Sequence, residues 1–122
     1  MKTIIGVESF EEMKTRTLAR AARISAGERI KPERRITFEN PSDLFACITP
    51  QRIRLIEAAR ETPRSVSDLA LRLKRQRAAV HRDVKTLADY GLVTLRKQKN
   101  PGHGQVQVVA ATAQAFTVTA KF

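Results

Sequence analysis

The stretch of the chain that most constrains its fold runs from residue 65 to residue 95. It holds two short runs with helical spacing, separated by a basic turn, and a strand-like run follows directly. In the second run Val80, Val84 and Leu87 recur at spacings of three and four, which places them on one apolar stripe. Gly91 then ends the helix, because glycine enters the left-handed conformation of a helix end without a Cβ penalty. Few fold classes contain two helices joined by a tight turn and followed by a strand.

The first of these two helices is predicted to begin at Ser67. Its hydroxyl can accept an early backbone N–H, and Val66 outside the helix can pack on Leu71 as a hydrophobic staple. Leu69 and Leu73 then face the core. The order helix, turn, helix, strand is typical of a winged helix-turn-helix. The sequence therefore predicts an α+β fold with a three-helix core, a β-hairpin wing and an N-terminal strand-helix arm.

The other parts of this fold lie on either side of that stretch. Thr49 and Pro50 provide a cap and a first-turn proline, which predict a first core helix through Arg60. The side chains that this helix is expected to bury are Ile53, Leu55, Ile56 and Ala59. After Leu95, a Pro/Gly loop joins two strand-like runs and predicts the wing hairpin. His103 in this loop is interpreted as a loop residue without a chemical role.

The polar side of the second helix carries the functional signal. At 100° per residue, Arg77, Ala78, His81, Arg82 and Lys85 lie on about one face, turned away from the apolar stripe. Arginine can pair with a guanine edge or a phosphate, lysine supplies a point charge, and histidine is a short donor or acceptor. This face therefore suits the groove of a nucleic-acid duplex. The alternative is that these charges only solvate a surface helix.

The turn before this helix favours an anion. Lys74, Arg75 and Arg77 crowd a helix start, where each exposed cation opposes the helix dipole by about 0.3–1 kcal/mol. Positions 74 to 76 also lack Ser, Thr, Asp and Asn, so no side-chain cap is expected for the first N–H groups. We hypothesise that a DNA phosphate completes this site. The predicted DNA-binding residues are Ser67, Lys74, Arg75, Gln76, Arg77, Ala78, His81, Arg82 and Lys85, together with Arg96, Lys97 and Lys99 of the wing, whose cations can reach a minor groove or the backbone.

The distribution of charge supports a polyanionic partner. The chain has a net charge of +11. Residues 1–48 hold 9 basic and 7 acidic side chains, a net +2, whereas residues 49–110 hold 13 and 5, a net +8. The excess therefore lies on the helix-turn-helix half. Structured RNA is a further candidate partner, but one Tyr, five Phe and no Trp argue against a surface on which bases stack.

The N-terminal region is expected to be an arm. Residues 3–7 predict a short strand, and Ser9 with Glu12 gives the spacing of a capping box before a helix to about Arg23. The apolar positions of this helix define no strong stripe, so it is predicted to bind a second copy or another protein, unless it docks on its own domain. The predicted partner-binding residues are Phe10, Met13 and Leu18.

Two domains are expected from this organisation. Residues 1–39 form the arm, for dimerisation or partner binding, and residues 40–122 form the winged helix-turn-helix domain. Residues 115–122 are rich in Val, Thr and Phe and predict a final strand, for which pairing across a dimer is one option.

No catalytic or metal site is expected. Cys47, His81 and His103 have no metal-ligand spacing, and no Gly-rich phosphate loop follows a strand. The single cysteine excludes an internal disulfide, and its apolar neighbours predict a buried thiol. No apolar run approaches the ~18 residues of a membrane span, and no signal-peptide core follows Lys2. We therefore expect a cytoplasmic protein that is not an enzyme and needs no cofactor.

Residues from about 38 to 110 resemble winged-helix regulators of the MarR and ArsR type. The chain looks most similar to a family of small predicted prokaryotic transcriptional regulators, on three runs: TPQRIRLIEAAR from Thr49, VHRDVKTLADYGLV from Val80 and GVESFEEMKTRTLARAAR from Gly6. Several such proteins are antitoxins of two-gene toxin–antitoxin modules. The resemblance thus implies a homodimeric autorepressor that binds an inverted-repeat operator in double-stranded DNA and also neutralises a toxin. The alternatives are a repressor without a toxin partner, or a protein-binding inhibitor whose DNA binding is secondary.

By the same resemblance, the recognition helix runs from Arg77 to Tyr90. Relatives often have Gly, Ser or Asp in the turn, where this chain has residues 74–76, KRQ. Asp83 on this helix is expected either to pair with an arginine such as Arg82 or Arg54, or to be solvated.

Overall fold

A computed structural model describes residues 1–100, 102 and 104–122 of the chain. His103, expected in the wing loop, lies outside the described residues. The chain divides into two compact units. The sheet unit comprises residues 1–46 and 115–122, and the winged unit comprises residues 47–114.

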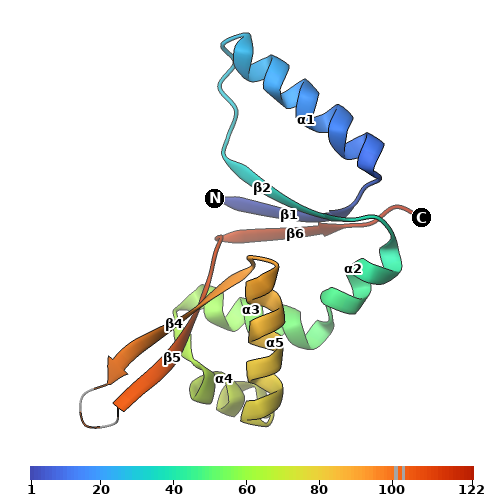
Figure 1. The fold of residues 1–122 in the computed structure, drawn as a ribbon. Coiled ribbons are helices and arrows are strands. Elements are labelled where there is room, and N and C mark those ends of the chain that lie inside the picture. The colour runs from blue at the N-terminus through green and yellow to red at the C-terminus, as the bar shows by residue number, and fades with distance from the viewer. Residues whose placement is uncertain (101, 103) are drawn as a thin grey trace. The chain divides into compact units, whose positions relative to one another are not determined.

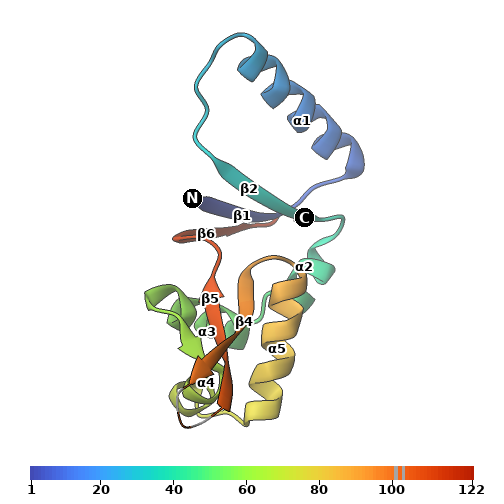
Figure 2. The same ribbon diagram turned by 60° about the vertical axis from the view of Figure 1, so that its left-hand side comes forward.

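The winged unit contains the predicted helices and hairpin in the predicted order. Its elements are α3 (Pro50–Glu61), β3 (Arg64–Ser65), α4 (Val66–Leu73), α5 (Arg77–Asp89), β4 (Val93–Asn100) and β5 (Gly104–Ala111). The strands form an antiparallel sheet in the order β3-β5-β4, in which β4 and β5 make the long wing hairpin (Figure 2). The helices α3, α4 and α5 with this wing constitute a winged helix-turn-helix.

The core of the winged unit follows the predicted apolar stripes. On α5, Val80, Val84 and Leu87 are fully buried. Burial of each such side chain contributes about 1.5–3 kcal/mol. On α3, Leu55, Ile56 and Ala59 are buried as expected, but the prediction for Ile53 is wrong, because 41% of it is exposed. At 100° per residue Ile53 lies roughly 110° away from the mean direction of those three residues, on the outer side of the helix.

The predicted start of α4 is also wrong. The N-cap is Ser65, whose Oγ accepts a hydrogen bond from the backbone N–H of Asp68 at 3.0 Å. Val66 is therefore the first helical residue, and it is buried rather than placed outside as a staple. Leu71 is 80% exposed, and Ser67 lies in the first turn without a capping role. A start two residues earlier than predicted lets Val66 enter the core, and the free energy of burying Val66 decides between the two equivalent serine caps.

The other predicted helix ends are confirmed. Thr49 caps α3, accepting the N–H of Arg52 at 3.2 Å. Gly91 follows the last turn of α5 with φ 75°, the left-handed conformation expected of it, and Tyr90 is the C-cap of that helix.

The sheet unit is built around a central parallel strand. Its elements are β1 (Lys2–Val7), α1 (Phe10–Ser25), β2 (Glu33–Phe38), α2 (Pro41–Cys47) and β6 (Ala115–Thr119). The strands are parallel in the order β2-β1-β6 (Figure 1). Ser9 and Glu12 form the predicted capping box at the start of α1. Parallel neighbours need a long crossover, which α1 supplies between β1 and β2.

The C-terminal strand differs from expectation. It was assigned to the winged domain, with pairing across a dimer as an option, but β6 pairs with β1 of the same chain. The physical reason is that β2 occupies only one edge of β1, and the second edge of this apolar strand needs a partner for its N–H and C=O groups. The predicted boundary at residues 39 and 40 stays a prediction.

Within the described ranges, no helix combines the length and the apolar character that a membrane span requires.

Candidate nucleic-acid interface

The side of α5 that faces away from the core of the winged unit carries the predicted cations. Arg77, Ala78, Arg82 and Lys85 are exposed, and His81 is half-buried. For the three cations among them, the part of the chain that the structure describes provides no ion pair with a carboxylate. Asp89 is the only acidic residue that shares this side, and it lies one turn beyond Lys85, at the C-terminal end. The N-terminal half of the face is therefore free to meet an external anion.

The start of α5 is uncapped, as predicted. Its N-cap is Gln76, whose side chain makes no capping hydrogen bond, and its first turn contains no acidic residue. The first N–H groups of the helix therefore lack side-chain acceptors, while Arg77 adds a positive charge beside them. Exposed N–H groups together with a cation are favourable for binding an anion such as phosphate.

Asp83 on α5 has partners other than those expected. Its Oδ2 accepts a hydrogen bond from Nη1 of Arg75 at 2.6 Å, and its Oδ1 accepts one from Nε of Arg52 at 3.2 Å. The prediction that Asp83 pairs with an arginine is confirmed, but Arg82 and Arg54 are the wrong partners, and the alternative of a solvated Asp83 is wrong as well. Asp83 lies about 100° around the helix from Arg82, on the edge that meets α3 and the turn.

This cluster, which we call the Asp83 cluster (Arg52, Arg75, Asp83), ties three elements together. The three side chains are 19%, 18% and 14% exposed, so they are largely removed from water. Arg52 also donates from Nη1 to the backbone carbonyl of Cys47 at 2.8 Å. The cluster therefore joins α3, the turn before α5 and α5 itself, and it engages Arg75, one of the predicted DNA-binding residues.

A second ionic cluster lies on α4. Arg64 donates to the carbonyl of Ala58 at 2.8 Å and contacts Glu61 at 3.0 Å and Asp68 at 3.3 Å. Asp68 also accepts from Nε of Arg72 at 3.0 Å. The hydrogen bond from Arg72 is the main reason why the pKa of Asp68 is lowered from its usual range, and Arg64 lowers it further. Ser67 on the same helix is exposed.

The wing presents cations on both of its faces. Arg96, Lys97 and Lys99 are exposed on β4, opposite Val108, Gln107 and Gln105 of β5. Because side chains alternate along a strand, Arg96 points to one face, and Lys97 and Lys99 point to the other.

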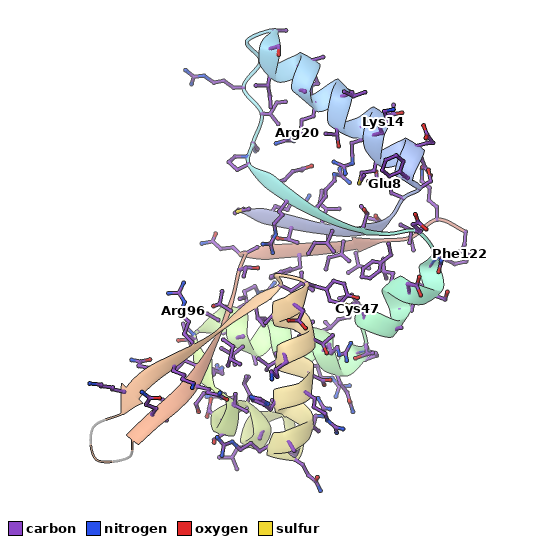
Figure 3. All side chains as sticks on the ribbon, viewed as in Figure 1. Glu8, Lys14, Arg20, Cys47, Arg96 and Phe122 are labelled. Carbon is purple, nitrogen blue, oxygen red and sulfur yellow. The ribbon has the colours of Figure 1, made fainter. Side chains whose placement is uncertain are left out.

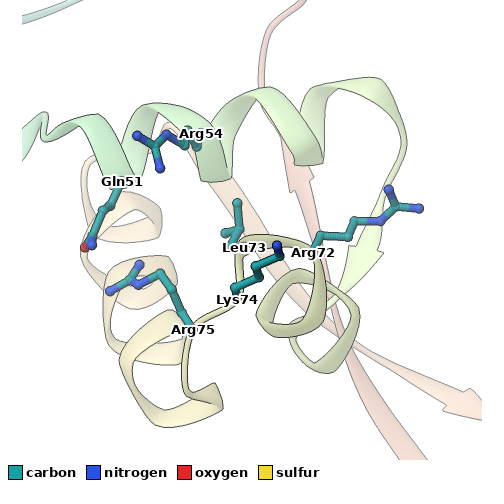
Figure 4. A pocket seen from close by; sticks show the side chains of 6 residues that line it. All are labelled: Gln51, Arg54, Arg72, Leu73, Lys74 and Arg75. Carbon is teal, nitrogen blue, oxygen red and sulfur yellow. The ribbon is translucent and has the colours of Figure 1, made fainter.

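A pocket opens beside the turn between α4 and α5, and the sequence predicted only some of the residues that line it. This turn pocket has a volume of about 340 Å³ and is lined by Gln51, Arg54, Arg72, Leu73, Lys74 and Arg75 (Figure 4). Only Lys74 and Arg75 were predicted site residues. The others come from α3 and α4, and no local pattern shows that these side chains meet the turn. Lys74 itself has φ 53°, the one left-handed residue other than glycine in the described chain.

The described residues contain no group of three or more His, Cys, Asp or Glu side chains that could hold a metal ion. Cys47 is buried, as predicted, and desolvation is the main reason why the pKa of its thiol is raised, although the nearby Arg52 charge opposes the shift.

The predicted partner-binding residues lie on α1, which has no buried residue. Phe10 and Leu18 are each 62% exposed, and Met13 is half-buried. Other side chains of α1 form ion pairs within the sheet unit. Arg16 binds Glu8, which follows β1, at 2.9 Å, and Arg20 lies 3.9 Å from Glu33 of β2. Figure 3 labels Glu8 and Arg20. Phe10 and Leu18 of α1 are thus largely exposed to solvent.

Comparison with known proteins places the winged unit in a family. Among solved structures, a possible transcriptional regulator from Methanosarcina mazei Go1 is 17% identical with a TM-score of 0.50, over 63% of this chain and 68% of that chain. Rv0081 of M. tuberculosis is 23% identical with a TM-score of 0.50, over 59% and 69%. Reduced HlyU from Vibrio cholerae N16961 is 17% identical with a TM-score of 0.50, over 85% and 83%. These likenesses concern the fold, and the predicted winged helix-turn-helix class is confirmed.

The comparison with curated proteins finds no match. The model of the HVO_A0114 family matches residues 47–111, more than half of the sequence, and the chain therefore belongs to the HVO_A0114 family.

Proposed function

We propose that this protein is a sequence-specific DNA-binding transcriptional regulator. The observation that carries the proposal is the exposed basic face of α5, formed by Arg77, Ala78, His81, Arg82 and Lys85 beside a helix start without a side-chain cap. The small side chain of Ala78 leaves room for close approach, and the arginines supply planar donors for guanine edges or phosphates. The similarity in fold to a possible transcriptional regulator is consistent with this role.

The proposed mode of binding places α5 in the major groove. Lys97 and Lys99 of the wing then contact the backbone, which fixes the register without reading bases. The protein acts as a two-fold dimer, so that two α5 helices enter successive major grooves about 34–36 Å apart. The preferred site is therefore an inverted repeat, and the operator lies before the protein's own gene, where binding represses transcription.

The test compares Arg82→Ala with Arg60→Ala in binding to the DNA upstream of the gene. Both arginines are exposed, but Arg60 lies near the end of α3, outside the proposed interface. If Arg82 reads a guanine, its loss should weaken binding by about 1–3 kcal/mol and relax specificity at one position, whereas Arg60→Ala should have little effect. Fluorescence anisotropy with operator and scrambled duplexes measures both. Equal binding by the two variants and by the unmodified protein would contradict the proposal.

The wing contributes in a different way. Replacement of Lys97 or Lys99 by Gln should weaken binding to all duplexes alike. Each lost phosphate contact should reduce the slope of log K against log salt by about 0.9. An unchanged slope would mean that these wing lysines make no phosphate contact.

A second role, as an antitoxin, is favoured by α1. Its apolar side chains Phe10 and Leu18 are exposed although the helix is well capped, which fits a helix that binds a partner protein through its apolar side. We propose that this helix binds a toxin encoded by the adjacent gene. Phe10→Glu and Leu18→Glu should abolish co-purification of that protein and leave DNA binding unchanged. Thr15→Glu is the control, because Thr15 is exposed and lies roughly 135° around α1 from the mean direction of Phe10, Met13 and Leu18. Point variants are preferable to deletion of residues 1–39, because that deletion removes the strands β1 and β2 with which β6 shares a sheet.

A further inference from the structure

The turn pocket is not explained by the proposed binding of α5 in a groove. Asp83, which holds Arg75 of the pocket, lies roughly 130° around α5 from the mean direction of Ala78, Arg82 and Lys85. The pocket therefore borders a different edge of α5 from the one proposed to face DNA bases. The basic residues that line the pocket therefore need a separate explanation.

The lining of the pocket is positive and has no acidic member. Four of its six residues are cations: Arg54, Arg72, Lys74 and Arg75. Arg72 and Arg75 are paired with Asp68 and Asp83, but within the described ranges neither Arg54 nor Lys74 has an ion pair. The charges of Arg54 and Lys74 beside the cavity are thus not compensated by a carboxylate, so an anion that enters the pocket is stabilised there.

The arrangement of the side chains fits a compact, multiply charged anion. Figure 4 shows Gln51, Arg54 and Arg75 gathered on one side of the pocket, with the Arg72 guanidinium directed away from them. Guanidinium groups and an amide are the donors that recognise phosphate oxygens, and a lysine adds a point charge. A volume of about 340 Å³ is also within the range of pockets that hold small molecules.

The backbone at Lys74 determines where a cation meets the pocket. Its φ of 53° is a left-handed conformation that glycine adopts without strain and that a lysine adopts at a cost. Lys74 is the C-cap of α4, and its backbone N–H donates to the carbonyls of Ala70 and Leu71, so this conformation closes the helix. A lysine at a position where glycine is the more stable choice places its ammonium group at the pocket.

We propose that the turn pocket binds a phosphate group, held by Arg54 and Lys74 with the help of Gln51 and Arg75. The phosphate belongs either to the DNA backbone or to a free phosphorylated molecule, and the chemistry of recognition is the same for both. The proposal goes beyond base reading by α5, because neither Arg54 nor Lys74 lies on that helix.

The first arm of the test uses pyrophosphate and the full chain without DNA. Calorimetric titration at constant ionic strength, with chloride as the balancing anion, gives the affinity. We expect Arg54→Gln and Lys74→Gly each to weaken binding at least about fivefold, since each loses a charge-assisted contact. Arg60→Gln, a charge loss on the same helix as Arg54 but outside the pocket, should stay within about twofold. Lys74→Gly remains folded because glycine relieves the left-handed strain, so its defect cannot be attributed to unfolding.

The second arm identifies the source of the phosphate. The same variants are titrated with a random-sequence duplex over a range of salt concentrations. A slope of log K against log salt that falls by about 0.9 in both variants assigns the phosphate to the DNA backbone. Unchanged DNA binding together with weakened pyrophosphate binding assigns it to a free phosphorylated molecule.

The proposal is overturned if Arg54→Gln and Lys74→Gly match Arg60→Gln in pyrophosphate affinity and in the slope with DNA. That result is distinct from failure of the proposed DNA-binding face, which is measured by Arg82→Ala with the operator.

Discussion

Replacement of Asp83 by Asn removes the one carboxylate of the Asp83 cluster and keeps its size. Arg75 and Arg52 then remain beside each other, 18% and 19% exposed, without the charge that compensates them. Removal of one partner from a fully buried ion pair costs about 3–5 kcal/mol, and residual access to water reduces this, so we expect a loss of about 2–4 kcal/mol. In a unit of this size each kcal/mol lowers Tm by roughly 4–8 °C, so Tm should fall by at least about 8 °C.

Urea denaturation followed by circular dichroism measures the free energy of unfolding. Arg82→Gln is the matched control, because Arg82 neighbours Asp83 on α5, is exposed and belongs to no ion pair in the described chain, so its loss should change stability by less than about 0.5 kcal/mol. Adding Arg75→Gln to Asp83→Asn should recover part of the loss, since it removes the surplus cation. The reasoning is refuted if Asp83→Asn costs no more than the control, or if the second substitution recovers nothing.

Three further substitutions test other features. Lys74→Gly should leave the protein equally stable or up to about 1 kcal/mol more stable by urea denaturation, because relief of left-handed strain exceeds the entropy cost of glycine. Leu87→Ala should cost about 2–5 kcal/mol, because Leu87 is fully buried. The third is Glu8→Gln. The hydrogen bond from Arg16 lowers the pKa of Glu8 below its usual range, so the carboxylate stabilises the fold at neutral pH and ceases to do so as the pH falls through the lowered pKa. The stability difference between unmodified protein and Glu8→Gln, about 1 kcal/mol at pH 7, should therefore vanish on acidification; a constant difference from pH 7 to pH 3 would contradict this.

The features that could be predicted from the sequence are those set by neighbouring residues. The stripe of Val80, Val84 and Leu87, the capping box of Ser9 and Glu12, and the cap at Thr49 are each fixed within one or two helical turns. Periodicity and capping chemistry act over that range, and all three predictions are confirmed.

What could not be predicted depends on which elements meet in space. Arg52 and Asp83 are 31 residues apart in sequence, and nothing local distinguishes Arg52 from Arg54 as the partner. The turn pocket likewise combines α3, α4 and the turn. The start of α4 was mistaken for a related reason: Ser65 and Ser67 are equally good caps, and only the burial of Val66 decides between them.

The pairing of β6 with β1 has a consequence for the order in which the chain can fold. The winged unit is one continuous segment, residues 47–114, and all of it has been synthesised before β6 leaves the ribosome. One edge of β1 must therefore stay open until residues 115–119 of β6 have been made. The winged unit can therefore reach its native state before the sheet unit does. Ribosome-bound chains that carry residues 1–114 followed by a flexible linker long enough to span the exit tunnel should protect the helices of the winged unit from proteolysis, while β1 and β2 remain cleavable.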